Sequence, residues 1–147
     1  RCYVAMKTSL LLAAVLFGSI PAAAGNANFA GNWTSDTHPA EMRSRDDICG
    51  NVSLVLTQDG EDIHGAYYNA PVGCGRIEDG GQVHGVAIGN SAVLTITSAR
   101  NGAVAIGVAR ISSGRLTWTL KEYVTDGEPS GDDLILGTFA LELAVNK

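Results

Sequence analysis

Apolar and polar residues alternate with a period of two through most of the chain beyond residue 50. In one such run Val52, Leu54 and Leu56 share a face, while Ser53 and Thr57 share the opposite face. Strict alternation is typical of a β-strand with one buried face, and no stretch beyond residue 25 carries helical spacing long enough to compete. The pattern therefore predicts a domain built from strands.

Eight strands are expected, separated by turn residues. They cover residues 32–36, 51–58, 62–69, 81–88, 92–98, 103–111, 115–124 and 134–145. Asp59-Gly60 and Asn101-Gly102 accept positive backbone φ and predict tight hairpins, and Gly89-Asn90 and Ser113-Gly114 indicate two more turns. Successive short connections make neighbouring strands antiparallel. We expect an all-β fold, an antiparallel up-and-down β-barrel of about eight strands, because closure leaves no open edge; the alternative is a β-sandwich.

One expected strand has a face that is almost free of side chains. Ala105, Gly107 and Ala109 share that face within residues 103–111. Such a wall lets a neighbouring side chain or a ligand approach closely. We expect Trp118, on the next strand, to lie inside the barrel near this wall.

Two segments break the alternation. Residues 37–48 are polar and charged and lead into Cys49, and residues 125–133 are acidic and rich in Gly and Pro. Both are expected to be loops. Cys49 and Cys74 are the two cysteines of the expected domain, and an even number in an oxidising compartment predicts a disulfide, which would hold the first of these loops.

The expectation of an oxidising compartment comes from the start of the chain. Residues 6–24 contain Lys7, an apolar run over residues 10–17, and the small residues Ala22-Ala23-Ala24. This is the pattern of a secretory signal peptide, cleaved after Ala24 or, as second choice, after Ala27. Residues 1–5 are read as upstream sequence, and residues 25–147 as one domain. The expected location is periplasmic or secreted, with no membrane association after cleavage, since the apolar run is too short to span a bilayer.

The charge of the expected mature chain argues against one class of partner. Without Arg1 and Lys7, eight basic residues stand against fifteen acidic ones, a net charge of about −7. The basic residues are scattered singly. An acidic surface repels phosphate backbones, so nucleic-acid binding is not expected.

Short motifs also carry a family resemblance. Gly31-Asn32-Trp33 resembles the glycine-x-tryptophan opening of the lipocalin and avidin-like (calycin) barrels, and residues 60–67 resemble an early avidin-type strand. In those families the tryptophan closes the barrel floor and a ligand sits in the mouth. As a whole the chain is similar to uncharacterised small exported proteins of proteobacteria that share a cysteine and an LxLxQDG strand, here Cys49 and residues 54–60. That second resemblance implies a compartment and a fold, and no activity.

No metal or catalytic site is expected. The three histidines are His38, His64 and His84, and the last two lie on consecutive expected strands as candidate cross-strand neighbours, but nothing supplies a third ligand. The acidic run in residues 125–133 (Asp126, Glu128, Asp132 and Asp133) lacks EF-hand spacing and is expected to be a solvated loop rather than a calcium site. No nucleophile motif is present, so the protein is expected to be non-enzymatic and without a cofactor.

Aromatic residues are the candidate ligand-binding groups. Tyr67, Tyr68 and Trp118 are assigned to ligand binding, and Trp33 to structure, because aromatic side chains suit both a core and an apolar pocket. Strand alternation places one of the two tyrosines inside and the other outside. The expected function is therefore a non-enzymatic exported barrel that binds a small, partly apolar ligand. The alternative is a protein-interaction module, such as an inhibitor of an extracellular hydrolase.

Overall fold

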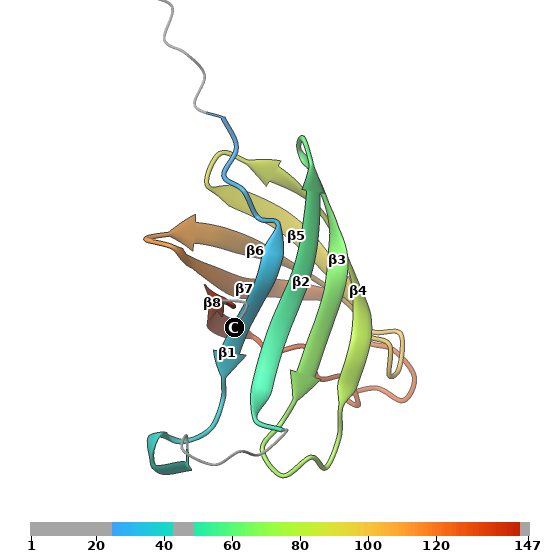
Figure 1. Ribbon diagram of the computed structural model, residues 1–147. Coiled ribbons are helices and arrows are strands. Elements are labelled where there is room, and N and C mark those ends of the chain that lie inside the picture. The colour runs from blue at the N-terminus through green and yellow to red at the C-terminus, as the bar shows by residue number, and fades with distance from the viewer. Residues whose placement is uncertain (1–24, 43–48, 145–147) are drawn as a thin grey trace, which may run out of the picture.

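The computed structural model describes residues 25–42 and 49–144 (Figure 1). The expected upstream residues 1–5 and signal peptide 6–24 lie outside these ranges. So does the second half of the expected loop 37–48, and the last residue of the expected strand 134–145.

The described chain is an all-β fold with eight strands and one short helical turn. The strands are β1 (Gly31–Asp36), β2 (Asn51–Asp59), β3 (Asp62–Ala70), β4 (Glu78–Ile88), β5 (Ser91–Thr97), β6 (Val104–Ser112), β7 (Arg115–Thr125) and β8 (Thr138–Leu143). The 3-10 turn η1 (Ala40–Met42) lies in the first loop, where no helix was expected.

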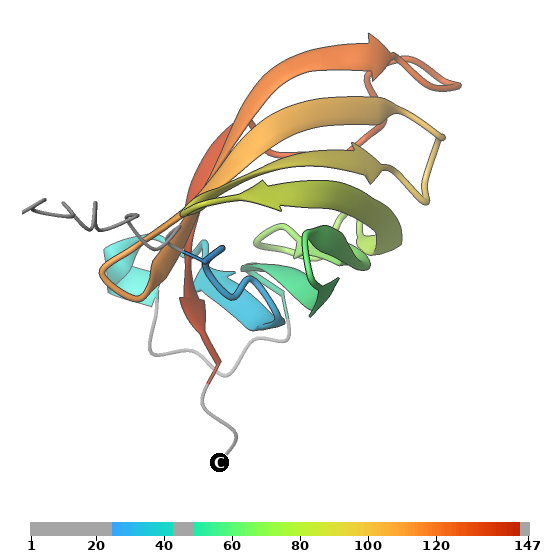
Figure 2. The same cartoon turned by 90° about the horizontal axis from the view of Figure 1, so that it is seen from above.

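The strands form a closed barrel in sequence order, each antiparallel to the next, and β8 pairs with β1. The expected up-and-down barrel is thus confirmed. Along β2 and β6 buried residues alternate with more exposed ones, because alternate side chains point inward. Figure 2 shows β4 to β7 as a broad curved wall that faces β1 to β3.

The barrel has two different ends. The turn end carries three two-residue hairpins, between β2 and β3, β4 and β5, and β6 and β7. Their turns are those predicted from Asp59-Gly60, Gly89-Asn90 and Ser113-Gly114, with φ of +61° at Gly60. The loop end carries the longer connections 37–50, 71–77, 98–103 and 126–137. Long loops at one end only give the molecule a single irregular face.

The turn end is closed by aromatic residues. Phe29 is fully buried there, and the indole Nε1 of Trp33 donates to the Phe29 carbonyl oxygen at 2.8 Å. The Phe29 amide in turn donates to Oε1 of Gln58 at 2.7 Å. Trp33 is therefore a structural residue that anchors the chain entering the barrel, in line with its expected role.

The prediction for the last strand was wrong at its start. The expected strand 134–145 begins only at Thr138, because Leu134 and Ile135 are buried beneath the loop end instead of pairing with a neighbour. Residues 134–136 are three successive apolar residues, so a strand made of them would have no polar face to turn towards solvent. Such a segment fits an enclosed position better than the wall of a barrel.

Closure between β8 and β1 is narrow. The two strands are paired at only two positions, Trp33 with Leu143 and Thr34 with Glu142, whereas β2 and β3 are paired along nine. The amide of Ala144 adds one hydrogen bond, 2.7 Å long, to the Asn32 carbonyl. This seam is the least connected part of the wall.

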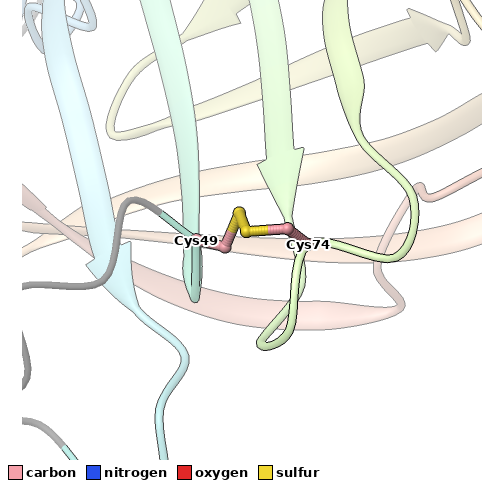
Figure 3. The surroundings of a disulfide bond; sticks show 2 residues. All are labelled: Cys49 and Cys74. Carbon is pink, nitrogen blue, oxygen red and sulfur yellow. A yellow bond between two sulfur atoms is a disulfide. The ribbon is translucent and has the colours of Figure 1, made fainter.

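Cys49 and Cys74 form the expected disulfide, with their Cα atoms 5.5 Å apart (Figure 3). The bond joins Cys49, two residues before β2, to the 71–77 loop at the loop end. Among the residues that the structure describes, no helix is long and apolar enough to cross a membrane.

Candidate functional site

The three expected ligand-binding residues lie in two different environments. Tyr67 and Trp118 point into the barrel and are fully buried, whereas Tyr68 faces outward and is half-buried. Tyr67 and Trp118 both pack against Phe139, with ring centroids 6.2 Å and 6.5 Å away. The structure thus brings Tyr67 and Trp118 together in the interior and leaves Tyr68 on the outer wall.

The wall without side chains receives Trp118. Ala105 and Ala109 are fully buried, and a Cβ built on Gly107 would stand 2.5 Å from Cη2 of Trp118. The indole therefore covers the backbone of β6 directly, which only glycine permits. The close approach predicted for this wall is made by a side chain of the protein itself.

Beyond the two rings lies the mouth segment, residues 134–136. The Tyr67 hydroxyl donates to the Leu134 carbonyl at 2.8 Å and accepts from the Leu136 amide at 3.2 Å. The Trp118 indole donates to the Leu136 carbonyl at 3.0 Å, and the Asn69 amide donates to Leu134 at 2.8 Å. Side chains of the barrel thus supply the hydrogen bonds that a neighbouring strand would otherwise give to the backbone of the mouth segment. They hold this segment at the loop end of the interior.

Ionisation of the tyrosines around this segment is suppressed. Burial raises the pKa of the Tyr67 phenol well above its usual value. Burial also raises the pKa of Tyr123 to about 12, helped by Asp133, whose carboxylate accepts a 2.8 Å hydrogen bond from the phenol. Both hydroxyls therefore remain neutral hydrogen-bonding groups at ordinary pH.

An ion-pair network ties three loops at the loop end. Asp132 accepts from Arg100 Nη2 at 2.9 Å and from Arg76 Nη1 at 3.1 Å, and these bonds lower the pKa of the Asp132 carboxyl. Arg100 also donates to the carbonyl of Asp132 at 3.1 Å and to that of Ile77 at 3.2 Å. One guanidinium thus connects the loops 71–77, 98–103 and 126–137.

Further hydrogen bonds reinforce these links. The side-chain amide of Asn101 donates to the Pro129 carbonyl at 2.8 Å, and the backbone amide of Glu128 donates to the Asn101 carbonyl at 2.9 Å. The fully buried carboxylate of Glu78 accepts from Ser98 Oγ at 2.5 Å and from the Ala99 amide at 2.6 Å. Glu78, the first residue of β4, had no signal in the sequence, since its partners lie on the distant loop 98–103.

The face that these loops present is both acidic and apolar. Asp126 and Glu128 are exposed, and so are the side chains of Val72, Ile77 and Val124. Val124 is the most exposed of the three apolar residues, at 61%. These charged and apolar side chains all lie on or next to the connections at the loop end.

The acidic run of residues 125–133 is partly engaged within the chain. Asp132 is held by the two arginines, and Asp133 accepts hydrogen bonds from Tyr123 and from the Ile135 amide. In the described ranges no group of three or more His, Cys, Asp or Glu residues is placed to hold a metal ion.

The three histidines do not gather into one cluster. His38 is buried at the loop end, with Nδ1 2.7 Å from Oδ1 of Asp36. His64 and His84 lie opposite each other on the outer wall, as expected for cross-strand neighbours, with their Nδ1 atoms 3.1 Å apart.

The outer surface also carries shallow grooves. A groove of about 370 Å³ follows the β1–β8 seam between Ser35 and Arg115, and a hollow of about 350 Å³ surrounds the His64–His84 pair.

No model of a known protein family matches the chain, and no curated protein matches it.

Proposed function

We propose that the protein is an exported, non-enzymatic interaction module that binds a protein partner through its loop end. The observation that supports this most is the cross-linked set of loops around Asp132, which presents exposed acidic and apolar side chains on a fixed scaffold. A surface that is already ordered loses little conformational entropy on binding.

The packing of the interior favours the same choice. Tyr67, Trp118 and the mouth segment occupy the loop end of the barrel, where a ligand would otherwise enter. A barrel filled towards its axis leaves its loops, rather than its cavity, for recognition. The disulfide between Cys49 and Cys74 fits a periplasmic or secreted location, where thiols are oxidised.

Charge indicates the kind of partner. Asp126 and Glu128 place part of the chain's excess negative charge at the loop end, so a basic protein is the complementary partner. A basic extracellular hydrolase would be such a partner, and the barrel bound to it would act as its inhibitor. Exposed charges at the rim of such an interface mainly speed association and make it sensitive to salt.

Native mass spectrometry of protein purified from its own host tests the proposal. We expect a complex with a second protein that dissociates as salt is raised. The variant Asp126→Asn/Glu128→Gln should weaken this complex, whereas Asp59→Asn/Glu61→Gln, which removes the same charge at the turn end, should not. A retained small organic molecule without a protein, or equal losses in both variants, would argue against the loop end as the binding surface.

Binding of a small, partly apolar ligand is the second candidate. It is favoured by the character of the mouth segment, which is apolar, lies outside the strands and is held against Tyr67 and Trp118 by side-chain hydrogen bonds. Displacement of this segment would expose both rings to a ligand, and Tyr68 would take part only from the outer wall.

Tryptophan fluorescence titrated with a panel of lipophilic ligands tests this candidate. Trp118→Ala should abolish binding and destabilise the fold by about 3–5 kcal/mol, as truncation of a buried aromatic does. Trp33→Ala should destabilise the fold and leave binding in place. Unchanged binding in a folded Trp118→Ala variant would remove the candidate.

A further inference from the structure

His64 on β3 and His84 on β4 are paired across the two strands on the outer wall of the barrel. Their Nδ1 atoms are 3.1 Å apart, the ring centroids are 5.3 Å apart, and the rings are nearly perpendicular, at 81°. Both side chains are exposed. The two Nδ1 atoms therefore lie within hydrogen-bonding distance of each other at a site open to solvent.

The backbone around the pair has a local two-fold arrangement. Ile63 pairs with Gly85 on one side of the histidines, and Gly65 pairs with Val83 on the other. A Cβ on either glycine would collide with the adjacent strand, β2 or β5. The glycines thus let the neighbouring strands pack closely, while the histidines between them face outward on a fixed β3–β4 ladder.

The separation of the two nitrogens matches the spacing that a metal ion imposes. Metal–imidazole bonds are about 2.0–2.1 Å long, so two nitrogens on one ion lie about 2.9 Å apart at a right angle and about 3.3 Å apart at a tetrahedral angle. The observed 3.1 Å falls between these values. An ion would therefore need no change in the strands that hold the ligands.

We propose that His64 and His84 bind one divalent transition-metal ion of the Cu²⁺ or Zn²⁺ class through their two Nδ1 atoms. Neutral imidazole is a preferred ligand for both ions, and Cu²⁺ binds more tightly than Zn²⁺ to a given nitrogen site. The hollow around the pair is also lined by Asp62 and Thr95.

The site is open rather than closed. Across residues 25–42 and 49–144 no third His, Cys, Asp or Glu completes a cluster with the pair. Two protein ligands leave the other positions of the ion to water or to a group from another molecule. The site lies on the β3–β4 wall, away from the loop end, so it is independent of the proposed protein-binding surface.

Proton NMR of the untagged protein tests the site directly, because the chain has three histidines and therefore three sets of imidazole signals. Added Zn²⁺ should shift the signals of His64 and His84 and leave those of His38 unchanged. Calorimetric titration should give one Zn²⁺ per chain, and electron paramagnetic resonance with Cu²⁺ should show two coordinating nitrogens.

Variants on the outer wall complete the test. Loss of groups that merely support a metal ligand weakens binding about 10–100-fold, so His64→Asn and His84→Asn should each weaken Zn²⁺ binding by more than about tenfold. Thr97→Ala, an outward-facing control on β5, should bind as the unaltered protein does. Zn²⁺ shifts confined to His38, or equal affinity in the histidine variants and the control, would overturn the proposal.

Discussion

The Tyr67 hydroxyl donates to the carbonyl oxygen of Leu134 at 2.8 Å, across 67 residues of chain. The Tyr67 hydroxyl oxygen also accepts from the Leu136 amide, so one phenol pairs with two backbone groups of the mouth segment. The Leu134 carbonyl also accepts from the side-chain amide of Asn69, whereas the Leu136 amide donates to the phenol. The hydroxyl therefore holds this segment at both its first and its last residue.

Tyr67→Phe should destabilise the protein by about 1–2 kcal/mol, because the half-buried Leu136 amide loses its acceptor while the ring stays in place. Amide hydrogen exchange should increase most in residues 134–136. Tyr68→Phe, on the outer wall, is the matched control and should leave both quantities unchanged. Uniform exchange in the Tyr67 variant would show that the phenol does not hold the segment.

Gly107→Ala should destabilise the barrel by about 1–3 kcal/mol, since the added methyl group meets both the Trp118 ring and the Thr119 carbonyl, each at 2.5 Å. Gly137→Ala makes the same chemical change with nothing within 4 Å of the new atom. That control should be neutral, or stabilising by about 0.4–1 kcal/mol. Urea unfolding of the two variants measures the difference, and equal midpoints would contradict the close approach at Gly107.

Alkaline pH should weaken the loop end. The pKa of Tyr123 rises from its usual 10.0 to about 12 in the folded protein, and that of Tyr67 rises in the same direction. A raised pKa means that the folded state keeps a proton which the unfolded state loses. The stability contributed by these phenols is thus complete below pH 10 and is lost as pH rises towards 12.

Urea unfolding on both sides of pH 10 checks this dependence. The double variant Tyr67→Phe/Tyr123→Phe should lose less stability over the interval than the unaltered protein, because its rings carry no ionisable hydroxyl. The same loss in both proteins would assign the alkaline effect to other groups.

Removal of the disulfide should lower the free energy of unfolding by about 3 kcal/mol, as expected for a closed loop of this size. Cys49 and Cys74 are separated by 25 residues, and the bond holds the first loop to the 71–77 loop. Cys49→Ser/Cys74→Ser compared with the oxidised protein by urea unfolding gives the value. Mass analysis with and without reductant should show the bond in exported protein, and two free thiols would contradict it.

The sequence predicted the parts of the fold that depend on neighbouring residues. Strand alternation and the dipeptide Asp59-Gly60 are local signals, and both gave the right elements. The interior position of Trp118 also followed, because alternation fixes its face and Gly107 leaves room for it.

The rest depends on contacts between distant segments. Residues 134–136 look like a strand until Tyr67 and Trp118 are known to supply their hydrogen-bond partners. The burial of Glu78 on β4 likewise depends on Ser98, twenty residues away in the loop 98–103. Such pairings are set by how the barrel closes, which no local pattern records.

The narrow seam between β1 and β8 has a consequence for how the chain matures. Both the mouth segment and the strand that completes the wall come from residues 134–143, so a chain emerging from its amino terminus exposes the free edges of β1 and β7 until these residues arrive. Open edges of this kind recruit strands from other molecules. Residues 134–143 therefore cover the edges of β1 and β7, and chains interrupted before residue 134 should accumulate as insoluble material.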